Sequence, residues 1–241
     1  MSTVDRRTES VERRIEVPKQ KEPQYGDIVI TDDKVAEGKH RKFVGGRWDE
    51  IGPHQLEYMK ECGLQPSHKF LDVGCGALRA GIHFVDYLDS GNYYGIDINH
   101  SLIEAGYNVE MTDEGRAKLP ITNLAETDRF DAEFGVKFDY AIANSVFTHM
   151  SLNYIRLALA RLAPVMASGG TFYATFFEQG DDFPIDGIYG KPPKRRFSER
   201  NVYWYYKDDM AWCASRLPFT AEYIGDWGHP RNQRMMRYTR D

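Results

Sequence analysis

Gly74 and Gly76, separated by one residue, directly follow the apolar segment Phe70–Val73. Such a segment predicts a buried strand, and a glycine pair at its end lets the backbone turn sharply and a ligand lie against the main chain. The apolar periodicity that starts at Leu78 predicts a helix after this turn. Strand, glycine turn and helix form the first unit of a nucleotide-binding α/β sheet, with the ligand at the carboxyl end of the strand.

A second predicted strand, Tyr93–Ile98, carries Asp97 near its end. A carboxylate at this place can accept hydrogen bonds from both hydroxyls of a ribose, so the two segments together indicate a site for an adenosine-containing ligand. A dinucleotide fingerprint has a third glycine three residues after Gly76, where this chain has Arg79. This departure argues against a diphosphate as the ligand.

Four short segments follow one another along the chain: Asp72-Val73-Gly74-Cys75-Gly76, Gly95-Ile96-Asp97, Phe138-Asp139-Tyr140-Ala141-Ile142-Ala143 and Ala167-Ser168-Gly169-Gly170. Their order resembles the motif series of class I S-adenosylmethionine-dependent methyltransferases. The resemblance implies an α/β fold that is Rossmann-like and doubly wound, with a mostly parallel seven-stranded sheet and an antiparallel last strand. It also implies S-adenosylmethionine as the cofactor and S-adenosylhomocysteine as the product.

The same resemblance implies a set of cofactor-binding residues. Asp72 would orient the glycine turn or reach the methionine amino group, and Asp97 would bind the ribose, unless it merely caps the following helix. Apolar side chains would contact the cofactor or belong to the core, and a polar turn after the third strand would meet the adenine or start a short helix. The full set is Asp72, Gly74, Cys75, Gly76, Leu78, Asp97, Ile98, Asp128, Phe130, Asn144 and Ser145.

His149 is the candidate general base. It follows the predicted strand Phe138–Ala143, at the sheet edge where an open parallel sheet presents its chemistry. Methyl transfer from a sulfonium is a direct displacement that depends mainly on alignment, and a base helps when the nucleophile is a hydroxyl. A histidine here can equally hold the loop by a hydrogen bond. His229 and Arg231 lie in a later loop that could also reach the site.

The composition is that of a globular protein, with 41% hydrophobic and 28% charged residues among 241. The formal net charge of −5 argues against a general nucleic-acid binder. The three cysteines, Cys62, Cys75 and Cys213, show neither metal-ligand spacing nor a disulfide framework. We therefore expect a cytoplasmic protein without a metal site. We also expect no signal peptide and no membrane span, because the chain lacks long apolar runs.

One methyltransferase domain, residues 25–241, is expected behind a flexible charged arm, residues 1–24. Residues 25–66 would form an N-terminal cap, with Phe43 and Trp48 as lid residues or as anchors of a helix. Residues 178–206 would form an irregular insertion over the active site, with a basic cluster at Lys191–Arg196. Further expected helices are Trp48–Cys62, Ser101–Glu110, Tyr154–Met166 and Lys207–Arg216, and further strands are Lys118–Leu124, Thr171–Phe177, Phe219–Tyr223 and Arg234–Tyr238.

The sequence thus predicts transfer of a methyl group to a hydroxyl or amine of a small molecule, such as a sugar or secondary metabolite. One alternative is a methyltransferase that acts on protein or RNA, and another is a non-catalytic cofactor-binding protein. An NAD-dependent oxidoreductase is opposed by Arg79 and by the turn Ala167–Gly170. The oligomeric state and the identity of the acceptor stay open.

Overall fold

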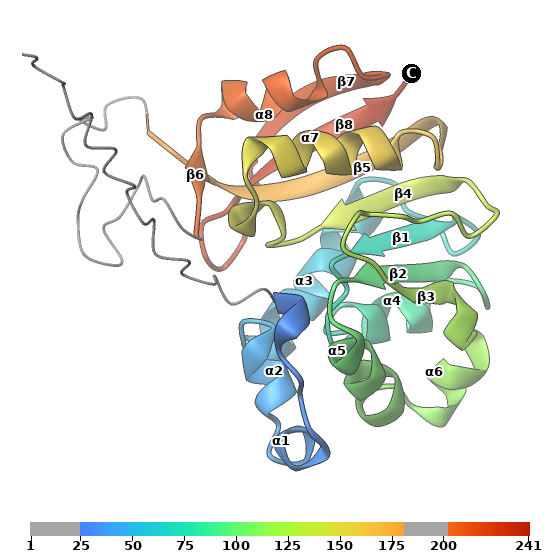
Figure 1. Ribbon diagram of the computed structural model, residues 1–241. Helices are drawn as coiled ribbons and strands as arrows, with labels where there is room; N and C mark the ends of the chain where they lie inside the picture. The colour runs from blue at the N-terminus through green and yellow to red at the C-terminus, as the bar shows by residue number, and fades with distance from the viewer. Residues whose placement is uncertain (1–24, 181–201) are drawn as a thin grey trace, which may run out of the picture.

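The computed structural model describes residues 25–180 and 202–241 (Figure 1). The expected charged arm, residues 1–24, and the basic cluster Lys191–Arg196 lie outside the described residues. Of the expected insertion, only the two flanks, residues 178–180 and 202–206, are described.

The sheet confirms the expected architecture, with one additional short strand. Seven strands lie in the order β3-β2-β1-β4-β5-β8-β7, and β6 pairs with the end of β5. The pairs among β1 to β5 are parallel, whereas β8 runs antiparallel to both β5 and β7. The strands are β1 (Phe70–Val73), β2 (Tyr93–Asp97), β3 (Leu124–Glu126), β4 (Phe138–Ala143), β5 (Met166–Glu178), β6 (Trp204–Tyr205), β7 (Phe219–Asp226) and β8 (Arg234–Arg240).

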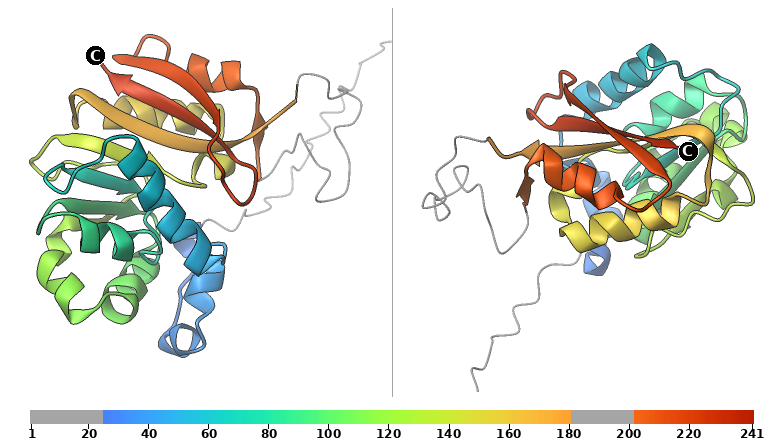
Figure 2. Two further views of the ribbon diagram at one scale, coloured as in Figure 1. Left: turned by 180° about the vertical axis from the view of Figure 1, so that it is seen from behind. Right: turned by 90° about the horizontal axis from the view of Figure 1, so that it is seen from above.

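Helices cover both faces of the sheet (Figures 1 and 2). Helices α3 and α4 pack on one face through a cluster that includes Met59 and Phe84, and α7 and α8 pack on the other through Leu159 and Met210. The helical segments are η1 (Tyr25–Asp27), α1 (Asp32–Ala36), α2 (Lys39–Phe43), α3 (Trp48–Glu61), α4 (Gly81–Tyr87), α5 (His100–Ala105), the π-helical η2 (Gly106–Glu110), α6 (Asp113–Lys118), η3 (Ile121–Asn123), η4 (Phe147–His149), α7 (Leu152–Leu162) and α8 (Lys207–Ala214). None of the helices in the described residues is long and apolar enough to cross a bilayer.

Strand β1 lies inside the sheet between β2 and β4, and all four of its residues are buried. The chain passes from β1 to β2 on one side and later returns to β4 on the other side of β1. In open α/β sheets the crevice at such a reversal, outside the carboxyl ends of the strands, is where ligands bind. The topology therefore places the predicted site residues of β1, β2 and β4 around one crevice.

Three local expectations were wrong. Helix α4 begins at Gly81 and not at Leu78, because Leu78 adopts a left-handed conformation with φ 58°. The third strand is Leu124–Glu126 and not Lys118–Leu124, since the helix α6 runs to Lys118 and the turn η3 follows Pro120. Met166 opens strand β5 instead of ending the preceding helix.

The N-terminal cap, from η1 to α3, is attached to the second βα unit by an ionic cluster. Glu110 accepts hydrogen bonds from Nε and Nη2 of Arg41, both at 2.7 Å, and also contacts Nε2 of His40. The carboxylate of Glu110 and the ring of His40 are both buried. Since a buried charge is stable only when it is paired, this cluster fixes α2 beside η2.

Candidate active site

A cleft of about 690 Å³ opens at the carboxyl ends of β1, β2 and β4. Every residue predicted for the site except Leu78 lines it, including His149. Leu78 is fully buried in the core with Phe84 and Tyr93, so it does not face the cleft. Of the two lid candidates, Phe43 lines the cleft, whereas Trp48 is buried in a separate small core cluster with Ile30 and Ala77.

The glycine turn is closely packed from two directions. Gly74 and Gly76 have φ of 78° and 53°, a conformation that side-chain-bearing residues adopt only with strain. A Cβ atom on Gly74 would lie 2.4 Å from Cγ2 of Val146, and one on Gly76 would lie 2.8 Å from Cγ1 of Val44. The turn thus requires glycine both for its backbone and for the approach of neighbours from the β4 loop and from the cap.

Asp97 holds this turn from the neighbouring strand. Its Oδ2 accepts a hydrogen bond from the backbone N–H of Gly76 at 2.8 Å, and its Oδ1 accepts one from Asn99 at 2.8 Å. Burial raises the pKa of Asp97, while these backbone donors act in the opposite direction. The side chain that caps α5 is Asn99, whose Oδ1 accepts from Leu102 at 3.1 Å. The carboxylate of Asp97 therefore remains directed at the cleft, with lone pairs to spare for further donors.

Asp72 lies deeper, at the floor of the cleft. Its Oδ2 accepts a hydrogen bond from the hydroxyl of Tyr93 at 2.9 Å, and the side chain is almost entirely buried. Burial raises the pKa of Asp72 to about 7; the Tyr93 hydrogen bond lowers it and the charge of Asp97 raises it further. A carboxyl group of this kind is poised to become charged when a cation comes close to it.

The end of β4 supplies two polar residues with different environments. Ser145 has φ 63°; its N–H donates to Oγ1 of Thr175 at 2.7 Å, and its Oγ lies 3.0 Å from Nε2 of the buried Gln233. The hydroxyl of Ser145 is thus already occupied by protein groups. Both amide atoms of Asn144, in contrast, are buried without a hydrogen-bond partner in the described part of the chain. Because such groups are normally satisfied, Asn144 is the better placed of the two for a bound ligand.

His149 ends the short helix η4 at the mouth of the cleft. Its Nδ1 lies 3.4 Å from the hydroxyl of Tyr25, and the two rings pack edge to face with centroids 5.1 Å apart. Tyr25 belongs to the cap and itself lines the cleft. The candidate base therefore stands between the sheet edge and the cap.

Two arginines form part of the cleft wall: Arg231, which the sequence placed in a loop that could reach the site, and Arg79, to which it gave no role there. Arg79, noted only as a departure from the dinucleotide pattern, donates from Nη1 to the carbonyls of Val44 and Gly46, both at 2.9 Å. Burial lowers its pKa to about 10, and the charge of Arg231 acts in the same direction. Arg231, from the loop between β7 and β8, donates to the carbonyl of Gly45. These contacts join segments far apart along the chain, so no local sequence pattern predicts them.

Residues 71–172 match the family model described as a methyltransferase domain. This match shows a methyltransferase domain over less than half of the chain and supports the class I S-adenosylmethionine-dependent methyltransferases as its superfamily. The matched residues run from β1 into β5, and they contain the glycine turn, Asp97 and the end of β4.

Solved structures with the same fold include several methyltransferases. An amino pentose methyltransferase from Micromonospora echinaspora, with bound S-adenosylmethionine, has a TM-score of 0.60 at 15% identity, covering 86% of this chain and 97% of that chain. Magnesium protoporphyrin IX methyltransferase from Synechocystis PCC 6803, with bound S-adenosylhomocysteine, has a TM-score of 0.56 at 15% identity, and the match covers 80% of this chain and 85% of that chain. An S-adenosylmethionine-dependent methyltransferase from Clostridium acetobutylicum has a TM-score of 0.58 at 13% identity, and the match covers 86% of this chain and 97% of that chain. At these identities the likeness concerns the fold.

Proposed function

We propose that the cleft binds S-adenosylmethionine and that the methyltransferase moves the methyl group to a hydroxyl or amine of a small molecule. The observation that carries the proposal is the joint position of Asp97 and the glycine turn in one cleft. A carboxylate and a turn without side chains at adjacent strand ends can take a ribose and the main body of a nucleoside.

The residues present fit an adenosyl amino acid along the cleft. Phe130 and Asp128, in the loop after β3, are suited to the face and the exocyclic amine of an adenine. Asp97 would accept the ribose hydroxyls. At the other end, Asp72 would face the amino group, since its raised pKa falls as soon as a cation lies beside it. Asn144 would find hydrogen-bond partners that the protein itself does not give it.

Methyl transfer of this kind does not require the protein to form a covalent bond with either reactant. The bound cofactor would supply a methyl group on a positively charged sulfur, which an acceptor lone pair displaces in line. The chain holds the reactants in place and excludes water, which are the main sources of rate in such a reaction. For a hydroxyl acceptor, His149 at the cleft mouth would take the proton at a ring nitrogen.

A small acceptor is supported by the shape and lining of the mouth. Tyr25, Tyr154 and Tyr203 line the same cleft as His149 and give flat surfaces on which a ring can pack. The neighbour from Micromonospora echinaspora is named for an amino pentose and the one from Synechocystis for a porphyrin. We propose a cytoplasmic setting, in keeping with three free cysteines.

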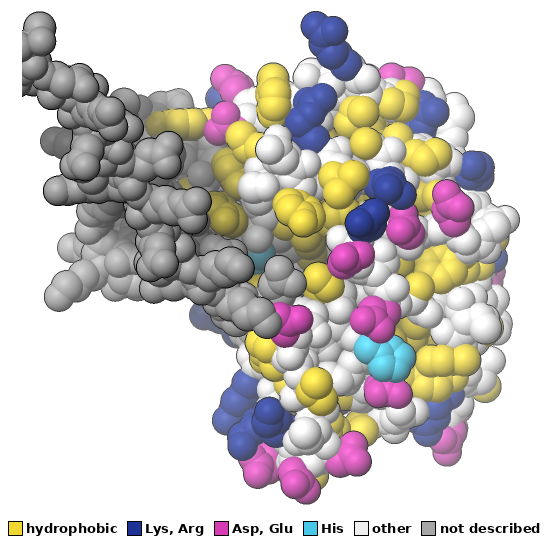
Figure 3. All heavy atoms as spheres, in the orientation of Figure 1, with side chains coloured by type: hydrophobic (Ala, Val, Ile, Leu, Met, Phe, Trp, Pro, Cys, Tyr) yellow, Lys and Arg dark blue, Asp and Glu magenta, His cyan; other side chains and the backbone are white. Residues whose placement is uncertain are grey.

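A macromolecular acceptor is the second candidate. On the face seen in Figure 3, acidic and basic side chains are mixed among hydrophobic ones. With a net charge of −5, this mixture gives little of the electrostatic footprint that nucleic-acid binding needs. A salt-sensitive association with RNA would favour this candidate instead.

The experiment is a turnover screen. The purified protein with S-adenosylmethionine is offered amino sugars, phenols and hydroxylated small molecules, and separately RNA and protein extracts, while release of S-adenosylhomocysteine is measured. We expect release above the acceptor-free rate with a small molecule. Release with RNA or protein alone would replace the small-molecule proposal, and bound cofactor that no acceptor ever consumes would support a non-catalytic binding protein.

A further inference from the structure

The segment between α2 and α3 has an unusual backbone. Gly45, Gly46 and Arg47 follow one another with φ of 94°, 64° and 48°, all in the left-handed region. Glycine adopts this conformation without strain, so Arg47 alone carries a strained backbone, but a run of three such residues is unusual and has many alternatives unless its surroundings hold it. We call residues 44–46 the carbonyl turn, because its three carbonyl groups are all held by arginine side chains.

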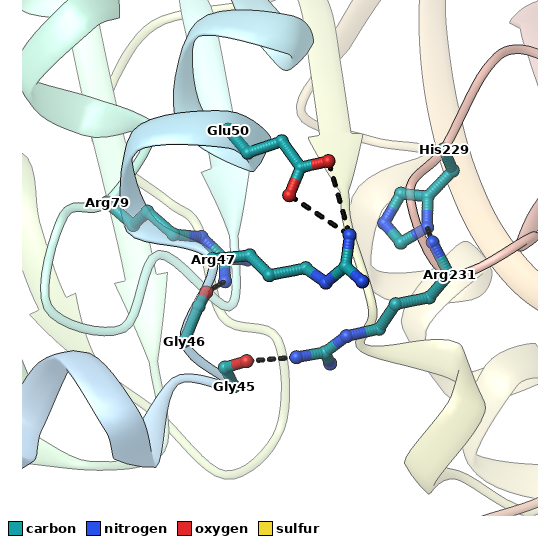
Figure 4. Close-up of polar contacts among 7 residues, drawn as sticks. All are labelled: Gly45, Gly46, Arg47, Glu50, Arg79, His229 and Arg231. Atoms are coloured by element: carbon teal, nitrogen blue, oxygen red, sulfur yellow. Dashed lines mark hydrogen bonds and ion pairs between the residues drawn. The ribbon is translucent and has the colours of Figure 1, made fainter.

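The two arginines come from opposite parts of the chain (Figure 4). Arg79, just after the glycine turn of β1, donates to the carbonyls of Val44 and Gly46. Arg231, in the loop between β7 and β8, donates to the carbonyl of Gly45 between them. Within residues 25–180 and 202–241, neither arginine forms an ion pair with a carboxylate. Their side chains donate instead to these carbonyls, and the backbone N–H of Arg231 donates to His229.

The carbonyl turn forms one wall of the cleft. Val44 and Gly45 line the cleft, and Cγ1 of Val44 lies 2.8 Å from where a Cβ of Gly76 would be. A shift of the turn would therefore move Val44 relative to the glycine turn on which the cofactor is proposed to lie. Arg231 itself lines the cleft, and its contact with Gly45 gives it a second, indirect effect on the cofactor site through Val44.

The loop that carries Arg231 is itself well anchored. Its backbone N–H donates to Nδ1 of the buried His229 at 3.1 Å, and the His229 ring packs on Trp227 with centroids 5.3 Å apart. Trp227 in turn lies 4.7 Å from the ring of His54 on α3. Burial and then the charge of Arg231 lower the pKa of His229 to about 3, so the ring is neutral and can accept this hydrogen bond. Arg231 therefore connects the packed rings of His229, Trp227 and His54 to the carbonyl turn.

We propose that Arg231 is a positioning residue of the methyltransferase: by holding the Gly45 carbonyl it sets the Val44 wall and, through it, the affinity for the cofactor. The inference rests on the proposed function, because it takes the cleft as the cofactor site. It assigns to a loop near the C-terminus an effect on a site formed by the first two strands.

The first test uses two neighbouring glycines that both have a left-handed backbone. A Cβ on Gly45 would lie 2.9 Å from Nη1 of Arg231, whereas one on Gly46 would meet nothing within 4 Å. Affinity for S-adenosylhomocysteine is measured by calorimetry for Gly45→Ala and Gly46→Ala, each in the parent and in an Arg231→Ala background. We expect Gly45→Ala to bind about tenfold more weakly than Gly46→Ala in the parent, and the two to agree within about twofold without Arg231. Equal affinities in the parent, or a full difference that persists without Arg231, would overturn the proposal.

The second test separates positioning from general stability. Arg231→Gln should weaken binding of S-adenosylhomocysteine about tenfold and speed its dissociation, while Arg231→Lys, which keeps a charged donor, should stay within about threefold of the parent. The control Arg216→Gln removes an exposed arginine just before the start of β7, whereas Arg231 follows the end of that strand. Thermal unfolding is recorded for each variant. Parent-like affinity in Arg231→Gln would refute the inference, whereas a parent protein that binds no S-adenosylhomocysteine would refute the proposed function itself.

Discussion

The carboxylate of Asp97 accepts the backbone N–H of Gly76 at 2.8 Å, so the acid of the second strand holds the glycine turn of the first. This hydrogen bond joins the two groups on which the proposed nucleoside site depends. It also means that a change at Asp97 acts on the ligand and on the turn together.

Asp97→Asn should weaken binding of S-adenosylhomocysteine roughly 10- to 100-fold. An amide has one acceptor oxygen, so either Gly76 or Asn99 would keep an unpartnered N–H group, and the ribose would lose a charged acceptor. The control Glu104→Gln makes the same change of charge at an exposed position on α5 and should bind like the parent. Calorimetry measures both. Parent-like affinity in Asp97→Asn would remove Asp97 from the site.

Gly74→Ala and Gly91→Ala form a second matched pair. Their φ angles are 78° and 76°, but a Cβ at Gly74 would lie 2.4 Å from Val146, whereas one at Gly91 would meet nothing within 4 Å. Gly91→Ala should lower the free energy of unfolding by about 1 kcal/mol, the cost of the left-handed backbone alone. Gly74→Ala should cost roughly 2–4 kcal/mol and abolish cofactor binding. Urea unfolding gives both values, and equal costs would contradict the packing of the glycine turn.

The raised pKa of Asp72 makes a prediction about pH. An unfolded carboxyl titrates near pH 4, whereas burial raises the pKa of folded Asp72 to about 7. Between these values the folded protein keeps a proton that the unfolded chain has released, so the contribution of Asp72 to stability falls as the pH rises from about 4 to 7. The stability of Asp72→Asn relative to the parent should therefore rise over this range by roughly 2–4 kcal/mol.

Urea unfolding of both proteins at several pH values between 4 and 8 measures this difference. Asp97, whose pKa is also raised, interacts with Asp72, so the difference reports Asp72 together with the part of the Asp97 titration that Asp72 influences. A difference that stays constant with pH would show that Asp72 is charged in the folded protein throughout.

His149→Gln should lower kcat for a hydroxyl acceptor by roughly 100-fold or more, as expected on removal of a general base. Affinity for S-adenosylhomocysteine should stay within about twofold, because His149 is proposed to act on the acceptor and not to hold the cofactor. The measurement is steady-state kinetics with an acceptor from the turnover screen. An unchanged kcat would leave His149 with a structural role.

The central strands could be predicted from the sequence because each one is a short, continuous apolar run. Phe70–Val73 and Phe138–Ala143 have the same limits in the structure as in the prediction. The third strand was misplaced because Leu124–Glu126 has only three residues and lies at the edge of the sheet, where burial gives no strong pattern. The start of α4 was misplaced because Leu78 has an apolar side chain in a non-helical backbone.

Some residues of the candidate site could likewise be predicted from the sequence, and others could not. The residues that line the cleft from β1, β2 and β4 follow from motif order, because strand ends of a parallel sheet meet at one edge. The contacts of Arg79 and Arg231 could not be predicted, since their partners are backbone carbonyl groups of the cap and every residue type supplies a carbonyl. Leu78, taken from the motif alone, proved to be a core residue.

Calorimetric titration of the full chain with S-adenosylhomocysteine, and in parallel with NAD, tests the central claim most directly. We predict saturable binding of S-adenosylhomocysteine at a 1:1 ratio, lost in Gly74→Ala, and no heat with NAD. Heat with NAD and none with S-adenosylhomocysteine would contradict the account.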